Sequence, residues 1–192
     1  MLTATGDVAH AGPRRPEARI AARRLQLRHA ASGARFSGTY HDGRAHDPAA
    51  LAALSVVLAD SRTGTVHPFD PRVIDILWEV GQRAGVRGEF LVFSGYRTPE
   101  TNAAVCGAGN SQHLRGAAID LCAPSRRLAD VGETALALGR GGVGVYAQSG
   151  FVHLDSGPVR RWGDVPLGNK GPAVPEDPLA KMAEAWAATR RR

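Results

Sequence analysis

Two histidines and an aspartate are the residues of this sequence whose types and spacing could hold a metal ion. His113 and Asp120 are the first and last residues of the stretch HLRGAAID, and a second histidine, His153, lies in the stretch FVHLD. Catalytic zinc sites usually take three protein ligands from His, Asp and Glu and leave one position for water. The three residues would supply two imidazoles and one carboxylate. Their spacing also fits core residues satisfied by hydrogen bonds, so it leaves both interpretations open.

The stretch that carries His153 offers a second carboxylate. Side chains alternate between the two faces of a strand, so Phe151, His153 and Asp155 are expected on one face, with Val152 and Leu154 on the other. Asp155 is therefore a candidate catalytic base, or a residue that orients His153. Backbone amides of the following DSGP turn could equally satisfy it.

Composition and charge indicate an ordinary globular domain with basic ends. The 192 residues are 43% hydrophobic and 22% charged, with 23 glycines and 12 prolines, which predicts one turn-rich domain plus tails. The net charge of +6 comes from the ends, because residues 1–35 hold seven arginines against two acidic residues and residues 190–192 are all arginine. The stretch between them is slightly acidic and shows no basic face interleaved with aromatics. We therefore expect no nucleic-acid partner.

No run of 18 apolar residues occurs, which predicts no membrane span. The first thirty residues also lack the apolar core of a secretory signal. Two interpretations follow from the residues alone, a cytoplasmic protein or a chain shown without its export segment.

Helices and strands that could position these residues are indicated by local patterns. A hairpin is expected where two alternating stretches flank Ser32-Gly33. Asp-Pro pairs predict helix starts at Asp47 and Asp70. A buried strand is expected over 89–95 and a strand, turn and strand over 142–157. Another helix is expected over 126–139 and a last one over 178–191.

The chain divides into three parts on these patterns. Residues 1–21, rich in Pro, Ala and Arg, predict a disordered basic arm. Residues 22–170 would form the domain that carries the candidate metal site. Residues 171–192 predict a linker and a C-terminal helix. We expect the protein to be a monomer.

Four motifs taken together resemble the M15-type zinc peptidases, in particular their DUF882 branch of murein endopeptidases. They are SGYRTPETNAAV (94–105), NSQHLRGAAIDL (110–121), GGVGVY (141–146) and FVHLDSGPVRRW (151–162). Their order and separation make the resemblance specific, and it extends over about residues 22–165. It implies an α+β fold in which a small antiparallel sheet, flanked by helices, carries a central zinc site.

The resemblance also implies roles for individual residues. His113, Asp120 and His153 match the zinc ligands, and Arg97 matches an arginine that faces substrate and steadies developing negative charge; a surface ion pair is the alternative for Arg97. Three further residues each have two interpretations. Ser94 and Gln112 could orient ligands by hydrogen bonds or could cap turns. Tyr146 could donate a proton to the site or could pack as a strand tyrosine.

Cys106 and Cys122 bracket the stretch from His113 to Asp120. The spacing suits a disulfide in an oxidising compartment, or two reduced cysteines. The envelope setting that the resemblance implies favours the disulfide. Direct binding of zinc by the thiolates is disfavoured, because three ligands are already assigned and a fourth would close the water position.

The function implied by the resemblance is a zinc-dependent peptidoglycan hydrolase that cleaves peptide crosslinks, in the periplasm or secreted. Its substrates would be the peptidoglycan stem peptides. Two alternatives remain: a D,D-carboxypeptidase acting on stem peptides, and an inactive zinc-containing module that binds the cell wall. The inactive module is kept because many relatives carry an acidic residue three positions before the last ligand, or a histidine two before it, where this sequence has Gly150 and Phe151.

Overall fold

A β-hairpin opens the folded part of the chain. In the computed structural model, which describes residues 21–123 and 125–163, β1 (Arg23–His29) pairs antiparallel with β2 (Arg35–His41). Gly33 turns the chain with a φ of 73°, a conformation that glycine adopts without strain. The hairpin predicted around Ser32-Gly33 is confirmed.

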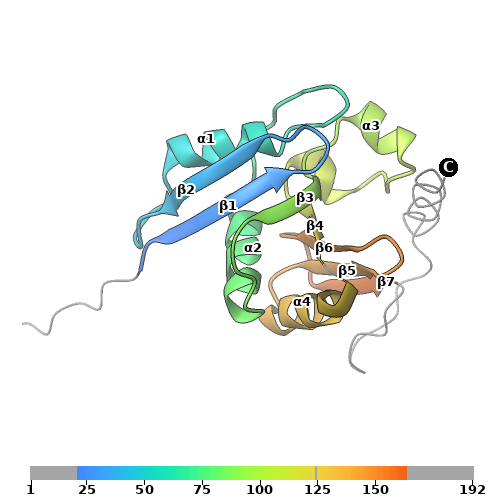
Figure 1. Cartoon of the computed structure of the whole chain (residues 1–192). Helices are drawn as coiled ribbons and strands as arrows, with labels where there is room; N and C mark the ends of the chain where they lie inside the picture. The colour runs from blue at the N-terminus through green and yellow to red at the C-terminus, as the bar shows by residue number, and fades with distance from the viewer. Residues whose placement is uncertain (1–20, 124, 164–192) are drawn as a thin grey trace, which may run out of the picture.

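Three helices begin or end as the local patterns predict. α1 (Pro48–Val57) and α2 (Pro71–Arg83) each start with a proline in the first turn, after an aspartate whose carboxylate accepts hydrogen bonds from the first backbone amides. α4 (Ser125–Leu138) ends at Gly139, which has a φ of 61°. α1 packs against β2, and α2 packs against α4 (Figure 1).

The described residues form a seven-stranded sheet in the order β2-β1-β3-β4-β6-β5-β7. Its remaining strands are β3 (Phe90–Ser94), β4 (Ala118–Cys122), β5 (Gly142–Tyr146), β6 (Phe151–Asp155) and β7 (Arg160–Gly163). The pairs β1–β3 and β5–β7 are parallel and the other four pairs antiparallel. The α+β class with helices on a sheet is therefore right, whereas the small antiparallel sheet was wrong. The chain passes through α1 and α2 before β3, and this long connection lets β3 join β1 in parallel.

Three elements gave no clear local signal. α3 (Pro99–Ala104) is only six residues long, and its Thr98-Pro99 start reads equally well as a turn. β4 is a short stretch whose pairing is entirely long-range. β7 is a polar edge strand of four residues. None of them is long enough to show a clear periodicity.

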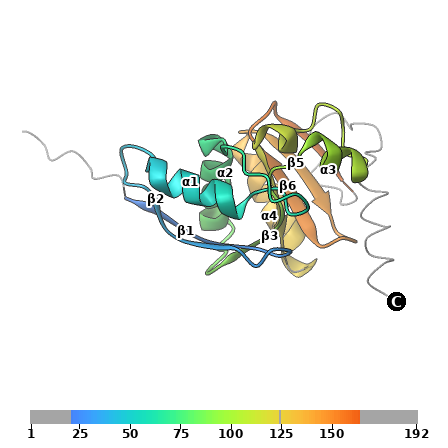
Figure 2. The same cartoon turned by 90° about the horizontal axis from the view of Figure 1, so that it is seen from above.

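The two faces of the central strands differ in character. Ile119, Leu121, Val152 and Leu154 point to the core shared with the helices, and all are at most 2% exposed. The alternate residues point to the opposite face, where Asp120 of β4 lies directly across from a residue of β6, His153. The candidate ligands therefore lie on the face of the sheet opposite this core. Figure 2 shows α1 lying along the hairpin strands β1 and β2.

The predicted basic arm and the predicted C-terminal helix fall outside the described residues, and the division of the chain into three parts stays a prediction. Within the described ranges, no helix combines the length and the apolar character needed to cross a membrane.

A buried aspartate, Asp60, holds the loop that follows α1. One carboxylate oxygen accepts hydrogen bonds from the amides of Arg62 and Thr63, and the other accepts from the amide of Thr98, at 2.8 Å. Burial alone would raise the pKa of Asp60, but these hydrogen bonds and one from Thr101 lower it to about 2. The carboxylate is therefore ionised in the folded chain near neutral pH.

The lowered pKa gives a stability prediction. The ordinary pKa is 3.8, so the unfolded chain takes up a proton at higher pH than the folded chain does. The stabilisation is complete above about pH 5 and is lost as the pH falls from about 4 to about 2, and it amounts to about 2 kcal/mol. An asparagine at position 60 does not titrate. The free energy of unfolding of Asp60→Asn should therefore lie further below that of the wild type at pH 6 than at pH 2, by about 2 kcal/mol. Urea unfolding across this range measures the deficit, and a deficit independent of pH would contradict the assignment.

Candidate metal centre

Three predicted ligand atoms converge on one point. Nε2 of His113 lies 3.2 Å from Nδ1 of His153 and 3.2 Å from Oδ1 of Asp120, and the last two atoms are 2.9 Å apart. Bonds of about 2.0–2.1 Å to a tetrahedral zinc ion place two ligand atoms roughly 3.3 Å apart. The observed triangle is close to one face of such a tetrahedron. The structure therefore brings together the three residues that the sequence singled out.

The ligands come from two kinds of element. Asp120 and His153 are neighbours on the paired strands β4 and β6. His113 lies in η1 (Gln112–Arg115), a single 3₁₀ turn that Ser111 caps at its start and Gly116 ends with a φ of 61°. All three side chains are buried, at 0% to 4% exposure.

Hydrogen bonds on the far side of each imidazole fix which nitrogen faces the cluster with a lone pair. Nδ1 of His113 lies 2.6 Å from the carbonyl oxygen of Gly95, which can only accept, so Nδ1 carries the proton. Nε2 of His153 lies 3.0 Å from the carboxylate of Asp155, so Nε2 carries the proton there. The two nitrogens inside the cluster are then both unprotonated. Such partners orient imidazoles in metal sites.

The cluster therefore holds two imidazole lone pairs and a carboxylate oxygen, with no donor between them. Acceptors that face one another in a buried site are unfavourable unless a cation lies among them. In the metal-free chain a second proton on His153 would place a donor between these acceptors. Burial lowers the pKa of His153, but the carboxylates of Asp120 and Asp155 outweigh this effect and raise it. The donor set fits a divalent metal ion.

The other two ligands stay in the states that metal binding requires. Burial lowers the pKa of His113 to about 4, with a further lowering by the charge of Arg97. Burial alone would raise the pKa of Asp120, but His113 and Arg97 hold it well below its usual range. Near neutral pH, His113 is neutral and Asp120 is ionised, so neither must lose a proton when a metal binds.

Arg97 lies beside the cluster and is held on two sides. Its Nε donates to the hydroxyl of Ser94 at 2.8 Å, and its Nη2 donates to Oδ2 of Asp120 at 2.5 Å. Its Nη1 is buried and has no hydrogen-bond partner in the described structure. One donor group of an oriented guanidinium therefore remains for another acceptor.

Asp155 lies behind His153, on the side away from the cluster. Its fully buried carboxylate contacts Nε2 of His153, accepts from the amides of Gly142 and Gly157, and accepts from both terminal nitrogens of Arg160 at 2.7 and 3.3 Å. Burial alone would raise the pKa of Asp155, but His153 and Arg160 lower it to about 2. The carboxylate stays ionised and fully hydrogen-bonded.

Aromatic residues extend the site face toward β7. The indole N–H of Trp162 donates to the hydroxyl of Tyr146 at 2.6 Å, and the Trp162 ring lies 5.1 Å from the His153 ring. A Cβ on Gly144 would come within 2.5 Å of the indole nitrogen, so this strand position requires glycine. Tyr146 is buried and stacks on Phe151, which places its hydroxyl at Trp162.

Two other predicted residues are placed by their neighbours. A Cβ added to Gly157 would come within 2.8 Å of the Gln112 amide nitrogen and 3.0 Å of Asp155. Gln112 therefore lies next to the groups that hold His153. Ser94 contacts Arg97, as described above. Ser94 is therefore linked to Asp120 through Arg97.

The predicted disulfide is not formed in this structure. Cys106 is exposed just beyond α3, and Cys122 is partly buried at the last position of β4. β4 starts beside η1, where the amide of Ala117 donates to Gln112, and then runs away for roughly 13 Å, at about 3.3 Å per residue. Cys122 therefore lies at the end of β4 that is farther from η1.

Arg160 and Trp162 are site residues to which sequence reasoning gave no role. Both belong to the FVHLDSGPVRRW motif, and a basic residue five positions after a buried aspartate is the signal that could have indicated the ion pair.

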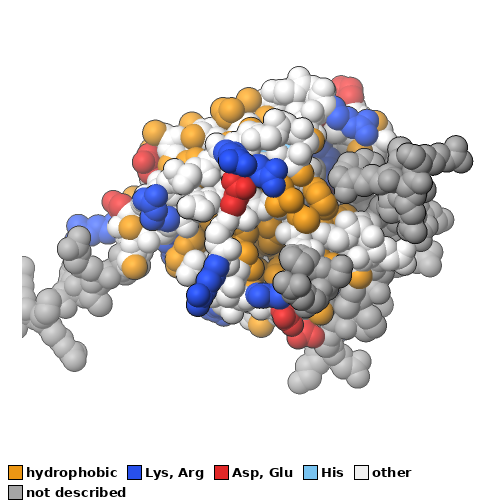
Figure 3. All heavy atoms as spheres, in the orientation of Figure 1, with side chains coloured by type: hydrophobic (Ala, Val, Ile, Leu, Met, Phe, Trp, Pro, Cys, Tyr) orange, Lys and Arg blue, Asp and Glu red, His pale blue; other side chains and the backbone are white. Residues whose placement is uncertain are grey.

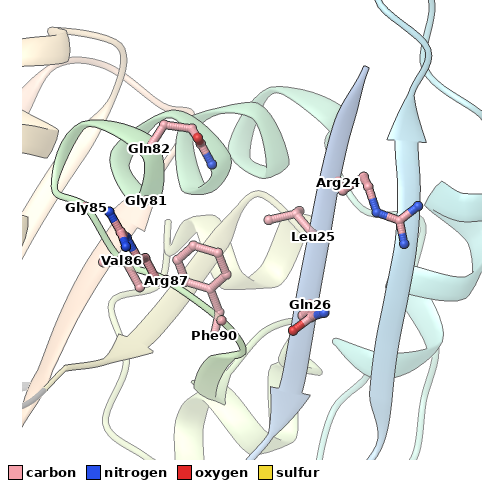
Figure 4. Close-up of a pocket in the computed structure, with 10 residues that line it drawn as sticks. Arg24, Leu25, Gln26, Gly81, Gln82, Gly85, Val86, Arg87 and Phe90 are labelled. Atoms are coloured by element: carbon pink, nitrogen blue, oxygen red, sulfur yellow. The ribbon is translucent and has the colours of Figure 1, made fainter. Parts of the chain in front are cut away.

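A separate cavity of about 530 Å³ lies between β1, the end of α2 and β3 (Figure 4). Arg24, Gln26 and Arg87 line it, and it includes no residue of the metal cluster.

A buried cluster of two histidines and one aspartate, with an oriented arginine next to it, has the donor set of a mononuclear metallohydrolase site. The comparisons with known proteins agree. The family model Peptidase_M15_2, described as peptidoglycan L,D-endopeptidase MepK, matches residues 17–162.

Two relatives illustrate the match. The probable peptidoglycan L,D-endopeptidase MepK of Haemophilus influenzae is 37% identical over 144 residues, which cover 72% of this chain and 77% of the relative. The peptidoglycan L,D-endopeptidase MepK of Escherichia coli K12 is 32% identical over 143 residues, which cover 72% and 79%. The chain belongs to this family of M15 peptidoglycan endopeptidases, and the resemblance found in its motifs is confirmed.

The cluster predicts stoichiometric metal binding. One Zn²⁺ or Co²⁺ should bind per chain, and His113→Ala should weaken binding by more than about 100-fold because a direct ligand is lost. Isothermal titration of metal-free protein measures both values. His41→Ala, on β2 at the far edge of the sheet, is the matched control and should bind like the wild type. Equal affinity of His113→Ala and wild type would contradict the site.

Proposed function

We propose that this protein is a zinc-dependent murein endopeptidase that hydrolyses peptide crosslinks of peptidoglycan. The observation that carries the proposal is the convergence of His113 Nε2, His153 Nδ1 and Asp120 Oδ1 as three acceptors with no donor between them. These residues would hold the ion. The chemistry that such an ion supplies is Lewis-acid activation of water and of the scissile carbonyl group.

The bond that we propose is an L,D peptide bond within a crosslink, because both relatives described above are named L,D-endopeptidases.

The proposed substrate also bears on where the protein acts. Peptidoglycan is part of the cell wall and lies outside the cytoplasmic membrane, so we propose that the protein acts in the periplasm or is secreted. On the face shown in Figure 3, basic side chains are spread among acidic and apolar ones. The basic side chains on this face therefore do not form one continuous patch of the kind that contacts a phosphate backbone. We keep the prediction that the protein acts as a monomer.

Arg97 is the residue that we propose to contact the substrate. Ser94 and Asp120 orient its guanidinium, and its buried Nη1 retains a donor for the carbonyl oxygen that gains negative charge during hydrolysis. A donor already in place stabilises that charge without reorganisation. Ser94 thus serves as an orienting residue for Arg97.

We propose that Asp155 positions His153 and is not the catalytic base. Its four hydrogen-bonding partners occupy both oxygens, and its low pKa keeps it ionised at the pH where a base must exchange protons. Its contact with Nε2 keeps the lone pair of Nδ1 directed at the cluster. Gln112, next to Asp155, supports the same arrangement.

Product analysis tests the proposed reaction. Purified peptidoglycan should give split crosslinks, with dimeric muropeptides converted to monomers, when wild-type protein is added with zinc. Asp120→Ala should lower the rate by at least about 1,000-fold, because it removes a metal ligand and leaves Arg97 unpaired. Chromatography with mass spectrometry identifies the products. Release of terminal D-alanine alone would indicate a carboxypeptidase, and binding to intact wall would indicate an inactive module.

A zinc titration of Asp155→Asn tests the positioning role. The amide group can donate to Nε2 of His153, which moves the ring proton to Nδ1 and removes the lone pair from the cluster. Zinc affinity should fall about 10- to 100-fold, and excess zinc should restore most of kcat. Loss of kcat that persists at saturating zinc would instead identify Asp155 as a proton-transfer group.

A further inference from the structure

The segment 95–98 between β3 and α3 supplies two essential parts of the site without belonging to a helix or strand. It carries Arg97, and the carbonyl oxygen of Gly95 orients His113 at 2.6 Å. A segment of irregular backbone does not hold its own geometry through a ladder of hydrogen bonds. The contacts that fix it must come from elsewhere in the fold.

Those contacts come from the end of α1 and the loop after it. The amide of Tyr96 donates to the carbonyl of Leu58 at 2.8 Å, and the amide of Thr98 donates to the carboxylate of Asp60 at 2.8 Å. The two amides flank Arg97 on either side. Gly95 lies so close that a Cβ there would be 2.4 Å from the Leu58 oxygen. The segment is therefore held through its own backbone amides on both sides of Arg97.

Asp60 is the charged side chain in this set of anchors; a second side chain of the same loop, His67, stacks its ring on Tyr96 with 4.7 Å between centroids. It is 1% exposed, and its carboxylate joins the loop amides of Arg62 and Thr63 to the amide of Thr98 and to the Thr101 side chain in α3. It thereby ties the loop after α1 to the first turn of α3. Arg97 lies immediately before that turn, and its own amide donates to the carbonyl of His113 at 3.1 Å.

We propose that Asp60 is a positioning residue for the reaction, which holds Arg97 in line with the metal cluster and, through the Gly95 carbonyl, holds His113. This inference rests on the proposed function, because Arg97 acts on the substrate there. Asp60 contacts neither the cluster nor the substrate position. A shift of Arg97 by about 1 Å is enough to lower a rate strongly.

Asp60→Asn tests the proposal with the least change of shape. An amide has one acceptor oxygen, so it cannot accept from Thr98 on one side and from Arg62 and Thr63 on the other. The kcat on crosslinked muropeptides should fall roughly 10- to 100-fold, with KM within about twofold, because the lost interaction acts in the transition state. Asp47→Ala is the matched control: it also removes a carboxylate that accepts from two backbone amides, at the start of α1. Its kcat should equal that of the wild type once both are compared below their unfolding temperatures.

A double-mutant cycle with Arg97→Ala separates positioning from general destabilisation. If Asp60 acts through Arg97, adding Asp60→Asn to Arg97→Ala should lower kcat by less than about threefold. Independent, multiplicative losses would overturn the proposal. So would a kcat loss that only follows the unfolded fraction, as in the Asp47→Ala control.

Co²⁺ affinity gives a readout that needs no activity. Asp60→Asn should still bind one Co²⁺, with affinity weakened about tenfold by the displaced Gly95 carbonyl, whereas Asp47→Ala should match the wild type. If the wild type fails to cleave peptidoglycan, the proposed function fails, and the Co²⁺ affinity alone decides the positioning role. An unchanged affinity in Asp60→Asn would overturn it.

Discussion

Three lone pairs that face each other in the protein interior are the constraint on which the rest of the site depends. The Gly95 carbonyl and the Asp155 carboxylate bind the outer nitrogens of the two imidazoles, and each thereby decides which nitrogen faces the other ligand atoms. The carboxylates of Asp120 and Asp155 raise the pKa of His153 against the effect of burial, which shows how strongly this group of acceptors favours a positive charge. Metal binding and folding are therefore coupled: a cation that fills the cluster favours the folded chain, because the unfolded chain does not bring the three ligands together.

The buried charges around the cluster are arranged in two pairs with different uses. Asp120 pairs with Arg97, and Asp155 pairs with Arg160, so each buried carboxylate has its own cation. A buried charge that lost its partner would be strongly destabilising. Arg160 directs both of its terminal nitrogens to Asp155, whereas Arg97 retains Nη1 without a partner in the described structure. The terminal nitrogens of Arg160 are thus bonded within the fold, whereas Arg97 retains one donor group that the proposed role assigns to the substrate.

The sequence predicted the parts of this structure that local physics decides. The Asp-Pro starts of α1 and α2, the turn at Gly33 and the alternation that puts His153 and Asp155 on one face need only neighbouring residues. The three candidate ligands, which the structure brings together, were chosen from residue types together with family motifs. The pairing of Asp120 with His153 across β4 and β6 could not be predicted in this way, because the sequence of a five-residue strand does not identify the strand with which it pairs. The parallel pairs that make the sheet mixed were missed for the same reason, and the cysteine spacing suggested a bond that is not formed in this structure.

The site is built from a rigid half and an anchored half. Asp120 and His153 sit on hydrogen-bonded neighbouring strands, where the sheet itself sets the 2.9 Å separation of their ligand atoms. Arg97 and His113 sit on a loop and on a single 3₁₀ turn, whose positions depend on contacts from outside the sheet. Those contacts come from the end of α1 and the loop after it, which lie far from the strands in sequence. The N-terminal half of the domain therefore contributes no ligand and yet determines where half of the site lies, because the backbone that carries the arginine has no ladder of its own.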